Sequence, residues 1–331
     1  MERLALVTGA TGVIGPELVQ QLMASGYSVR VLVRRPPPAA LLPESVEVMI
    51  GDVTDPGAAA AAVAGITHVF HLAAKLHINN PSTAFAGQYW KTNVEGTRLL
   101  AEAARDAGVS RFVFFSSIAV YGPTTPGDVL DEDSPALAKS LYGSTKRDAE
   151  NVLLSLRRAS DGEPLAVILR IAGVYGSRIK GNYRELVRWL RRGVFVPIGP
   201  GHNRRTLVYE QDVADAALLA AVHPAAAGRI FNVTDGEVHT FRDIVSVICQ
   251  VLERRPPRFH IPTPVARACA HALDAGLLLG GRNRVAAPLI DKLVEDMAVS
   301  GLRLQKELGF RPKFGLEKGW QATIPRLVGH G

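Results

Sequence analysis

The amino-terminal stretch constrains the fold more than any other part of the chain. An apolar run, Leu4 to Val7, leads into a glycine-rich segment, Thr8 to Gly15, and then into a helix-like run that ends near Gly26. A second apolar run begins at Val29. Short apolar runs are typical of buried parallel strands. The order strand, glycine-rich turn, helix and strand therefore predicts the first unit of an α/β sheet.

Three glycines in the turn point to a phosphate site. The first-turn N–H groups and the positive end of a helix dipole can bind a pyrophosphate. We expect Gly9 to allow the tight turn, Gly12 the close approach of phosphates, and Gly15 the packing of helix on strand. Glycine also serves turns alone, but the flanking strand and helix favour dinucleotide binding. The predicted cofactor residues here are Gly9, Thr11, Gly12, Val13, Ile14 and Gly15.

Charge at the end of the second strand bears on the choice of cofactor. The strand ends at Val33, and Arg34 and Arg35 follow where NAD-binding folds place an acid for the adenosine ribose. Arginine can pair with a ribose 2′-phosphate, so we favour NADP(H) slightly over NAD(H), with Arg34 as the cofactor residue. The alternative is that both arginines face solvent.

Two later strands carry further candidates at their carboxyl ends. Val46 to Ile50 is followed by Asp52 and Val53, and Asp55 suits the N-cap of the next helix better than Asp52 does. Thr67 to His71 runs into small residues, which let the backbone approach a ligand. The candidate residues at these places are Asp52, Val53, Leu72, Ala73 and Ala74.

A serine, a tyrosine and a lysine form the predicted catalytic group. Ser117 follows the strand Arg111 to Phe115, and ligands of open α/β sheets lie outside the carboxyl ends of strands. Tyr142 and Lys146 are four residues apart and share a helical face. A free phenol has a pKa of about 10, and a nearby ammonium and a nicotinamide cation would lower it. The alternative for a lone Tyr-x-x-x-Lys is an ordinary amphipathic helix.

Composition excludes several classes of partner and site. The chain has 331 residues, 47% of them hydrophobic, and a formal charge of +7. It has no run of five like charges and no basic stripe interleaved with aromatic residues, so we expect no nucleic acid partner. Cys249 and Cys269 are expected to be buried thiols in a reducing compartment, with no metal site.

The most apolar late segment, Pro264 to Gly281, contains Arg267, His271 and Asp274 and makes a poor membrane span. A helix lying on a membrane surface is the alternative for this segment. The first apolar run belongs to the nucleotide strand, so we expect no signal peptide and a cytoplasmic protein.

These motifs resemble the extended branch of the short-chain dehydrogenase/reductase superfamily, the NAD-dependent epimerases and dehydratases. The resemblance covers nearly the whole chain and implies a doubly wound parallel Rossmann sheet of about seven strands with a smaller C-terminal substrate domain. It implies a nucleotide domain of residues 1–176, to which 207–235 return, and a substrate domain of 177–206 and 236–331.

The resemblance also implies roles for single residues. Asp52 takes the place of the acid that contacts the adenine amino group, and Ser117 that of the catalytic Ser/Thr. Asn93 takes a supporting role beneath the site, and His71 a structural one. Relatives commonly pair through helices like 91–107 and 141–157, which implies a homodimer.

The motifs Lys180 to Tyr183 and Asn203 to Val208 are similar to those of enzymes acting on UDP-N-acetylhexosamines. By that resemblance Asn182 meets the substrate and Arg205 its diphosphate; a guanidinium can bind phosphate bidentately. The alternative is a surface role for Arg205. Arg282 and Arg284 are weaker phosphate candidates, and Asp212 is expected to cap the helix Val213 to Val222.

The family relation implies hydride transfer at the C4 of a UDP-hexose or UDP-N-acetylhexosamine, by a 4-epimerase or a 4-keto-sugar reductase. Ile118 and Ala119 stand where dehydratases have Asp-Glu, which disfavours dehydration. A 3-beta-hydroxysteroid-dehydrogenase-like oxidoreductase is an alternative, since Pro262 to Leu279 is apolar. A non-catalytic NADP(H)-sensing module is a further one, although such modules typically lack the tyrosine and lysine.

Overall fold

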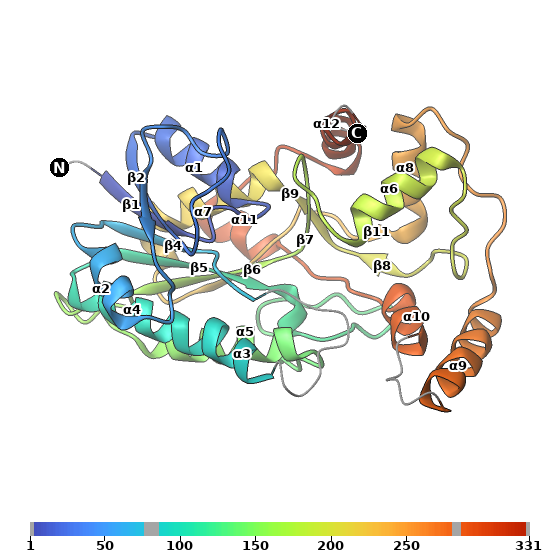
Figure 1. The fold of residues 1–331 in the computed structure, drawn as a ribbon, viewed down its shortest axis with the longest axis horizontal. Helices are drawn as coiled ribbons and strands as arrows, with labels where there is room; N and C mark the ends of the chain where they lie inside the picture. The colour runs from blue at the N-terminus through green and yellow to red at the C-terminus, as the bar shows by residue number, and fades with distance from the viewer. Residues whose placement is uncertain (1–2, 76–85, 280–285, 329–331) are drawn as a thin grey trace.

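A parallel sheet forms the centre of the molecule (Figure 1). The structure is a computed structural model that describes residues 3–75, 86–279 and 286–328. The sheet has seven strands in the order β10-β6-β5-β4-β1-β2-β3, and its paired strands run parallel. The strands are β1 (Arg3–Thr8), β2 (Tyr27–Val33), β3 (Glu47–Ile50), β4 (His68–His71), β5 (Arg111–Ser117), β6 (Ala166–Ile171) and β10 (Ile230–Val233). The predicted doubly wound sheet is confirmed.

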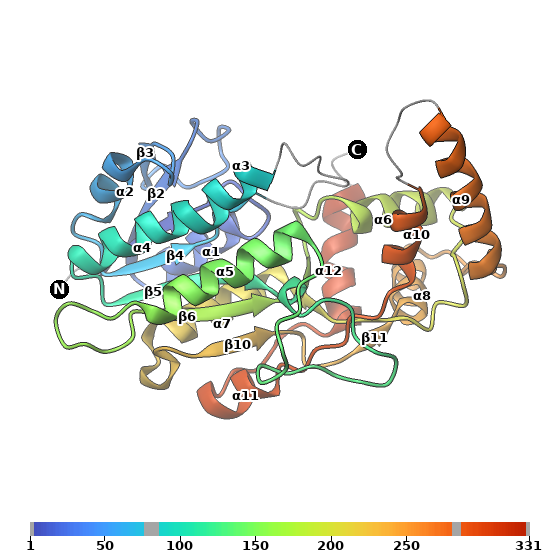
Figure 2. The same ribbon diagram turned by 90° about the horizontal axis from the view of Figure 1, so that it is seen from below.

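Helices cover both faces of this sheet, as Figures 1 and 2 show. One face carries α1 (Gly15–Ala24) and α7 (Glu210–Val222), and the other α2 (Pro56–Val63), α4 (Gly96–Asp106) and α5 (Leu141–Ser155). Apart from the exposed edge strand β3, the strands are largely buried on both sides, and each helical layer forms its own apolar cluster with the sheet. Burial on both faces explains why the strands read as continuous apolar runs.

The helix expected over 91–107 is composite. It consists of α3 (Ala86–Trp90), a π-helical turn η2 (Lys91–Glu95) and α4, which follow one another without a break. A 3₁₀ turn, η3 (Ile118–Val120), follows β5. Single π-helical turns inside helices are frequent at functional sites.

Most of the remaining elements lie at the end of the molecule away from the N-terminus, whereas α11 (Leu302–Leu308) lies against β10 of the sheet (Figure 1). Strand β7 (Gly173–Tyr175) pairs with β9 (Leu207–Tyr209), and β8 (Arg204–Arg205) pairs with β11 (His239–Thr240). A third apolar cluster, with Trp320 fully buried, joins several of the helices. The helices in this part are α6 (Asn182–Arg192), α8 (Phe241–Val251), α9 (Thr263–Leu279), α10 (Ala286–Val294) and α12 (Leu316–Val328).

The structure confirms one predicted cap and corrects two other expectations. Asp55 caps α2 by accepting hydrogen bonds from the N–H groups of Gly57 and Ala58. Asp212 does not cap a helix: α7 already begins at Glu210, and the Asp212 carboxylate instead accepts from the N–H groups of residues 313 and 314 at 2.8 and 3.0 Å. Cys249 is buried, but Cys269 is exposed because it lies on the outer face of α9. In the described part of the chain, no helix is long and apolar enough to cross a membrane.

Candidate functional site

The glycine-rich turn has the shape of a phosphate cradle. Gly9 has a φ of +74°, and a Cβ there would lie 2.7 Å from the nitrogen of Ala73. A Cβ on Gly15 would lie 2.3 Å from the carbonyl oxygen of Ala10. The predicted roles of Gly9 in the turn and Gly15 in close packing are thus confirmed. No side chain caps the N-terminus of α1, so its first-turn N–H groups stay available to an anion, and this turn fits a dinucleotide pyrophosphate.

The cradle lies where the chain reverses its direction of travel across the sheet. Strand β1 lies between β2 and β4, and a crevice at such a switch point is the usual ligand site of open α/β sheets. The other predicted cofactor residues follow neighbouring parallel strands, so they reach the same edge: Arg34 is exposed after β2, Asp52 and Val53 follow β3, and Leu72, Ala73 and Ala74 follow β4. Asp52 accepts hydrogen bonds from the N–H and hydroxyl of Thr54, each at 2.9 Å.

Helix α5 brings the tyrosine and the lysine to Ser117. Ser140 caps α5 by accepting a hydrogen bond from the N–H of Gly143. A Cβ on Gly143 would lie 2.4 Å from the carbonyl oxygen of Ala119, so α5 begins directly against the turn after β5. Ser140 and Gly143 were not predicted as site residues. Ser140 has a recognisable N-cap signature, whereas the need for Gly143 depends on a tertiary contact.

Burial controls the acid–base properties of the group. Burial raises the pKa of Tyr142 to about 12, although a hydrogen bond with Ser117 lowers it. In the protein alone, desolvation of the phenolate outweighs this hydrogen bond, so the expected lowering of the pKa beside a nicotinamide cation stays a prediction. Burial lowers the pKa of Lys146 to about 7, and the negative charge of Glu150 acts in the opposite direction. The Lys146 ammonium lies 4.0 Å from the centroid of the Phe114 ring.

A buried ion pair lies beside the predicted catalytic group. The Arg170 guanidinium donates to the Glu150 carboxylate at 2.7 Å, and the two side chains are only 6% and 2% exposed. The Ser116 hydroxyl also donates to Glu150. Glu150 was not predicted from the sequence, although its position four residues after Lys146, on the same helical face, is a signal for it.

Asn93 links the segment after β4 to α5. Its side-chain oxygen accepts from the N–H of Lys75 at 2.7 Å, and its amide group donates to the Thr145 hydroxyl at 3.0 Å. Asn93 belongs to the π-helical turn η2, which lies against α5. This network agrees with a supporting role for Asn93 beneath the site.

The two predicted substrate residues lie outside the catalytic group. Asn182 is exposed at the first turn of α6. Arg205, on β8, donates to the carbonyl oxygens of Glu295, Lys292 and Leu293 at 2.5, 2.9 and 3.1 Å. Its guanidinium thus binds the C-terminal end of α10, which sequence reasoning did not anticipate. Arg282 and Arg284 lie outside the described residues. Over residues 3–75, 86–279 and 286–328, no group of His, Cys, Asp and Glu could hold a metal ion.

A buried histidine predicts a pH dependence of stability. His71 bonds the hydroxyls of Thr8 and Thr97 at 2.6 and 2.9 Å, and burial lowers its pKa to about 3. The unfolded chain binds this proton near pH 6.5 and the folded chain near pH 3, so stability is lost as the pH falls through this window. We expect about 1.4 kcal/mol of this loss per pH unit in urea unfolding. In His71→Gln, the free energy of unfolding should depend less steeply on pH, by the equivalent of one proton taken up on unfolding. An unchanged pH dependence would contradict this assignment.

Residues 5–234 match the sequence model of the NAD dependent epimerase/dehydratase family. The chain belongs to this family. It is 30% identical to the UDP-glucose 4-epimerase of Vibrio cholerae, over 99% of this chain and 96% of that protein. It is 30% identical to the 3 beta-hydroxysteroid dehydrogenase/Delta 5-->4-isomerase of Mycobacterium tuberculosis, over 98% of this chain and 90% of that protein. Among solved structures, the UDP-glucose 4-epimerase of Thermus thermophilus in complex with NAD has a TM-score of 0.77 at 26% identity, covering 99% and 100% of the two chains.

Family membership confirms the predicted relation to the extended short-chain dehydrogenases/reductases. The chain is an enzyme of this type. Its described residues combine a phosphate cradle at β1 with a Ser–Tyr–Lys group at β5, on the same edge of one sheet. The arrangement can bind a dinucleotide and move a proton at an alcohol or ketone oxygen beside it.

Proposed function

We propose that this enzyme is a nicotinamide-dependent UDP-sugar 4-epimerase acting on a UDP-hexose or UDP-N-acetylhexosamine. One observation carries the proposal: Ser117 and Tyr142 interact at the carboxyl end of β5, with Lys146 buried one turn further along α5. The glycine cradle at the neighbouring switch point supports it. A 4-keto-sugar reductase uses the same group and is the other outcome of the test below.

The residues divide the chemistry between them. Tyr142, as phenolate, accepts the proton of the sugar C4 hydroxyl while the C4–H bond breaks, and Ser117 donates a hydrogen bond to the same oxygen. A bound nicotinamide nucleotide supplies the hydride acceptor and the hydride donor. Lys146 would hold the nicotinamide ribose and, when charged, stabilise the phenolate. Tyr142 would return the proton to the oxygen when the C4 ketone is reduced on its other face, which would give the epimer.

The surroundings of Ser117 disfavour a dehydratase. Dehydration requires removal of the C5 proton and loss of the C6 hydroxyl, which needs an acid and a base beside the serine. Ile118 is buried there, and Ala119 carries no ionisable group. The proposal therefore contains redox chemistry at C4 alone.

Substrate binding is assigned to the C-terminal part of the chain. We infer that Asn182 meets the sugar and Arg205 the diphosphate, in a substrate domain of residues 177–206 and 236–331. The cofactor then belongs to residues 1–176 and 207–235. Diphosphate binding by Arg205 requires it to leave some of the carbonyl oxygens that it contacts at the end of α10. A homodimer and a cytoplasmic location stay predictions.

A hydroxysteroid dehydrogenase is the second candidate. The similarity to the Mycobacterium tuberculosis enzyme favours it, since the identity of 30% equals that to the Vibrio cholerae epimerase. Both reactions use the Ser–Tyr–Lys group, so the substrate alone separates them. The steroid reaction would need an apolar substrate pocket, for which the apolar segment Pro262 to Leu279 is the candidate in the sequence.

The function is tested by incubating the purified protein with UDP-N-acetylglucosamine, UDP-glucose or UDP-glucuronate, with added NAD or NADP, and following the sugar by NMR. Appearance of the C4 epimer without net cofactor turnover supports the proposal. In a parallel incubation with a UDP-4-keto-sugar, net oxidation of NADPH identifies the reductase. Turnover of a 3-beta-hydroxysteroid alone, with no change in any UDP-sugar, overturns the proposal in favour of the second candidate.

The exposed arginines after β2 predict the cofactor preference. If Arg34 and Arg35 bind a ribose 2′-phosphate, Arg34→Ala/Arg35→Ala should raise the Kd for NADP by about ten-fold or more, because a charged hydrogen bond is lost. The Kd for NAD, measured on the same variant, serves as the control and should hardly change. Equal effects on both cofactors, or none, would show that the arginines do not select NADP.

A further inference from the structure

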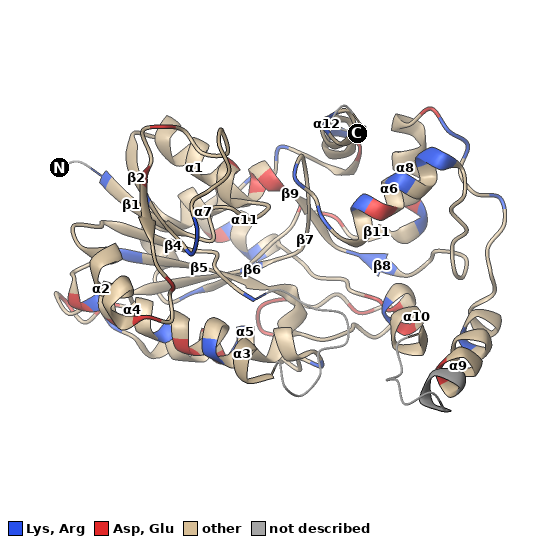
Figure 3. Cartoon of the chain, viewed as in Figure 1, with Lys and Arg blue, Asp and Glu red and all other residues tan. Residues whose placement is uncertain are grey.

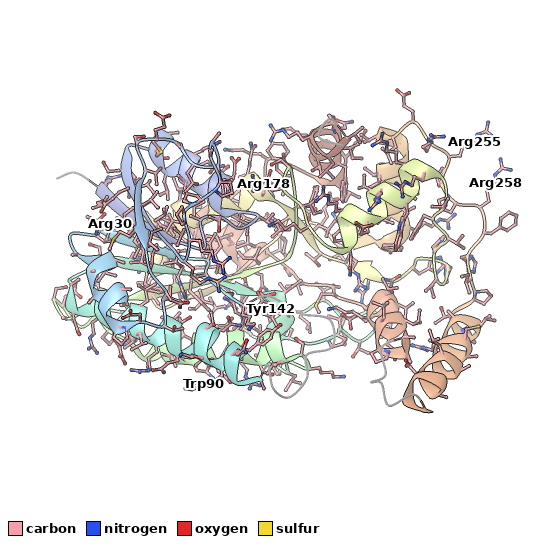
Figure 4. The ribbon with its side chains drawn as sticks, in the orientation of Figure 1. Arg30, Trp90, Tyr142, Arg178, Arg255 and Arg258 are labelled. Atoms are coloured by element: carbon pink, nitrogen blue, oxygen red, sulfur yellow. The ribbon has the colours of Figure 1, made fainter. Side chains whose placement is uncertain are left out.

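One exposed segment combines basic and apolar side chains without any carboxylate. Residues 254–273 join α8 to α9 and form most of α9; they include four arginines and two histidines but no Asp or Glu. Arg254, Arg255 and Arg258 are exposed, and Figure 4 shows the last two directed away from the molecule. Figure 3 shows basic residues along this connection. We call residues 254–273 the basic-apolar segment.

The apolar side chains of this segment are unusually accessible. Phe259 is 83% exposed, Val265 52% and Leu273 58%. Val265, Ala268, Cys269 and Ala272 are exposed at a spacing of three and four residues, so they form one apolar strip along α9. A contiguous apolar surface of this kind marks an interaction site.

The opposite face of α9 is already used within the chain. Ala266, Ala270 and Asp274 are buried on this face, and α9 packs on α10. The Asp274 carboxylate accepts from the N–H groups of Ala286 and Ala287, each at 2.9 Å, and so caps α10. The pair of helices lies at the extreme end of the molecule in both ribbon views (Figures 1 and 2). The strip therefore faces outward from a supported helix.

The positive charge of the segment indicates what kind of partner binds its apolar strip. Apolar residues combined with Lys and Arg are characteristic of helices that lie in the interface of anionic membranes. Arg267 donates a hydrogen bond to Asp291 of α10 at 2.9 Å. The three arginines before α9 have no acidic residue within the segment to balance their charge. We propose that the basic-apolar segment docks this enzyme on the surface of an anionic lipid bilayer, with Phe259 and the α9 strip in the interface. The proposal is independent of the sugar substrate.

The test is sedimentation of the full chain with vesicles of phosphatidylcholine alone or mixed with phosphatidylglycerol. Each basic residue near an anionic surface contributes a factor of about five, so Arg255→Glu/Arg258→Glu should lower partitioning onto the mixed vesicles by about 25-fold or more. The control, Lys306→Glu/Arg311→Glu, makes the same change in net charge at exposed positions on α11 and after it, and should lose much less. No binding to the mixed vesicles, or equal loss in both variants, overturns the proposal.

The apolar strip is tested separately. Phe259→Ser/Val265→Ser should reduce binding, whereas Val222→Ser, at an exposed apolar position on α7, should not. A solvatochromic thiol dye on the exposed Cys269 should shift to the blue on adding mixed vesicles; Cys249 is buried and shielded from labelling. Sedimentation velocity without vesicles tests whether the strip instead binds a second copy of the chain. Self-association that Phe259→Ser abolishes would assign the strip to that dimer contact and overturn membrane docking. UDP-sugar turnover should be unchanged in every variant.

Discussion

Tyr142→Phe is expected to lower kcat by about 10² to 10⁴-fold while cofactor binding is retained. The phenol is the only group in the proposal that moves the proton of the C4 hydroxyl, and positioned acid–base groups contribute rate factors of this size. Phenylalanine keeps the shape of the partly buried ring, so the fold should be maintained. The measurement is steady-state turnover of the UDP-sugar found in the NMR experiment, with cofactor Kd measured alongside.

Tyr27→Phe provides the matched control. Tyr27 is a buried tyrosine, whereas Tyr142 is partly buried; Tyr27 is the first residue of β2 and so lies at the opposite edge of the sheet from the site. Loss of the Tyr27 hydroxyl should leave kcat within about two-fold of the unsubstituted enzyme's value. The residue touches no reacting group, so its substitution removes no transition-state contact. Near-normal turnover in Tyr142→Phe, or an equal loss in both variants, would refute the assigned role.

Glu150→Gln is expected to destabilise the fold by about 3 kcal/mol, because removing one member of a buried ion pair leaves the other charge uncompensated. Arg170 would then be a buried cation without a counter-charge, 4.7 Å from the ring of Tyr121. Since the charge of Glu150 raises the pKa of Lys146, its loss should also lower that pKa further. The measurements are urea unfolding and the pH profile of kcat.

An exposed pair supplies the control for this effect. Glu102 bonds Arg98 at 2.6 Å on the surface of α4, with both side chains about one-third exposed. Glu102→Gln should change the free energy of unfolding by less than about 0.5 kcal/mol, because solvent screens such pairs. Equal destabilisation by the two variants would show that burial of the Glu150–Arg170 pair is unimportant.

The two predictions depend on different sources of information. Tyr142 was identified from its spacing to Lys146 and from the motifs around it, and the structure brings it to Ser117 as that interpretation requires. The ion pair of Glu150 with Arg170, in contrast, depends on the packing of α5 against β5 and β6. Arg170 lies on β6, and no local pattern joins residues on two such elements.

The sequence alone determined the sheet and the glycine-rich turn, and it predicted the Ser–Tyr–Lys group that the structure brings together. These features depend on short-range rules: apolar runs form strands, and Gly9 and Gly15 permit the turn and the packing that β1 and α1 require. The family relation could also be read from these motifs, because their residues are close together in the chain.

The tertiary structure decided the electrostatics and the surfaces. The pKa of Tyr142 rises to about 12 because distant segments exclude water from the phenol. Asp212 bonds residues 313 and 314, Arg205 binds the end of α10, and Cys269 faces outward. Each of these outcomes depends on segments far apart in the chain, and burial and partner choice are set by where such segments meet, which local sequence patterns do not encode.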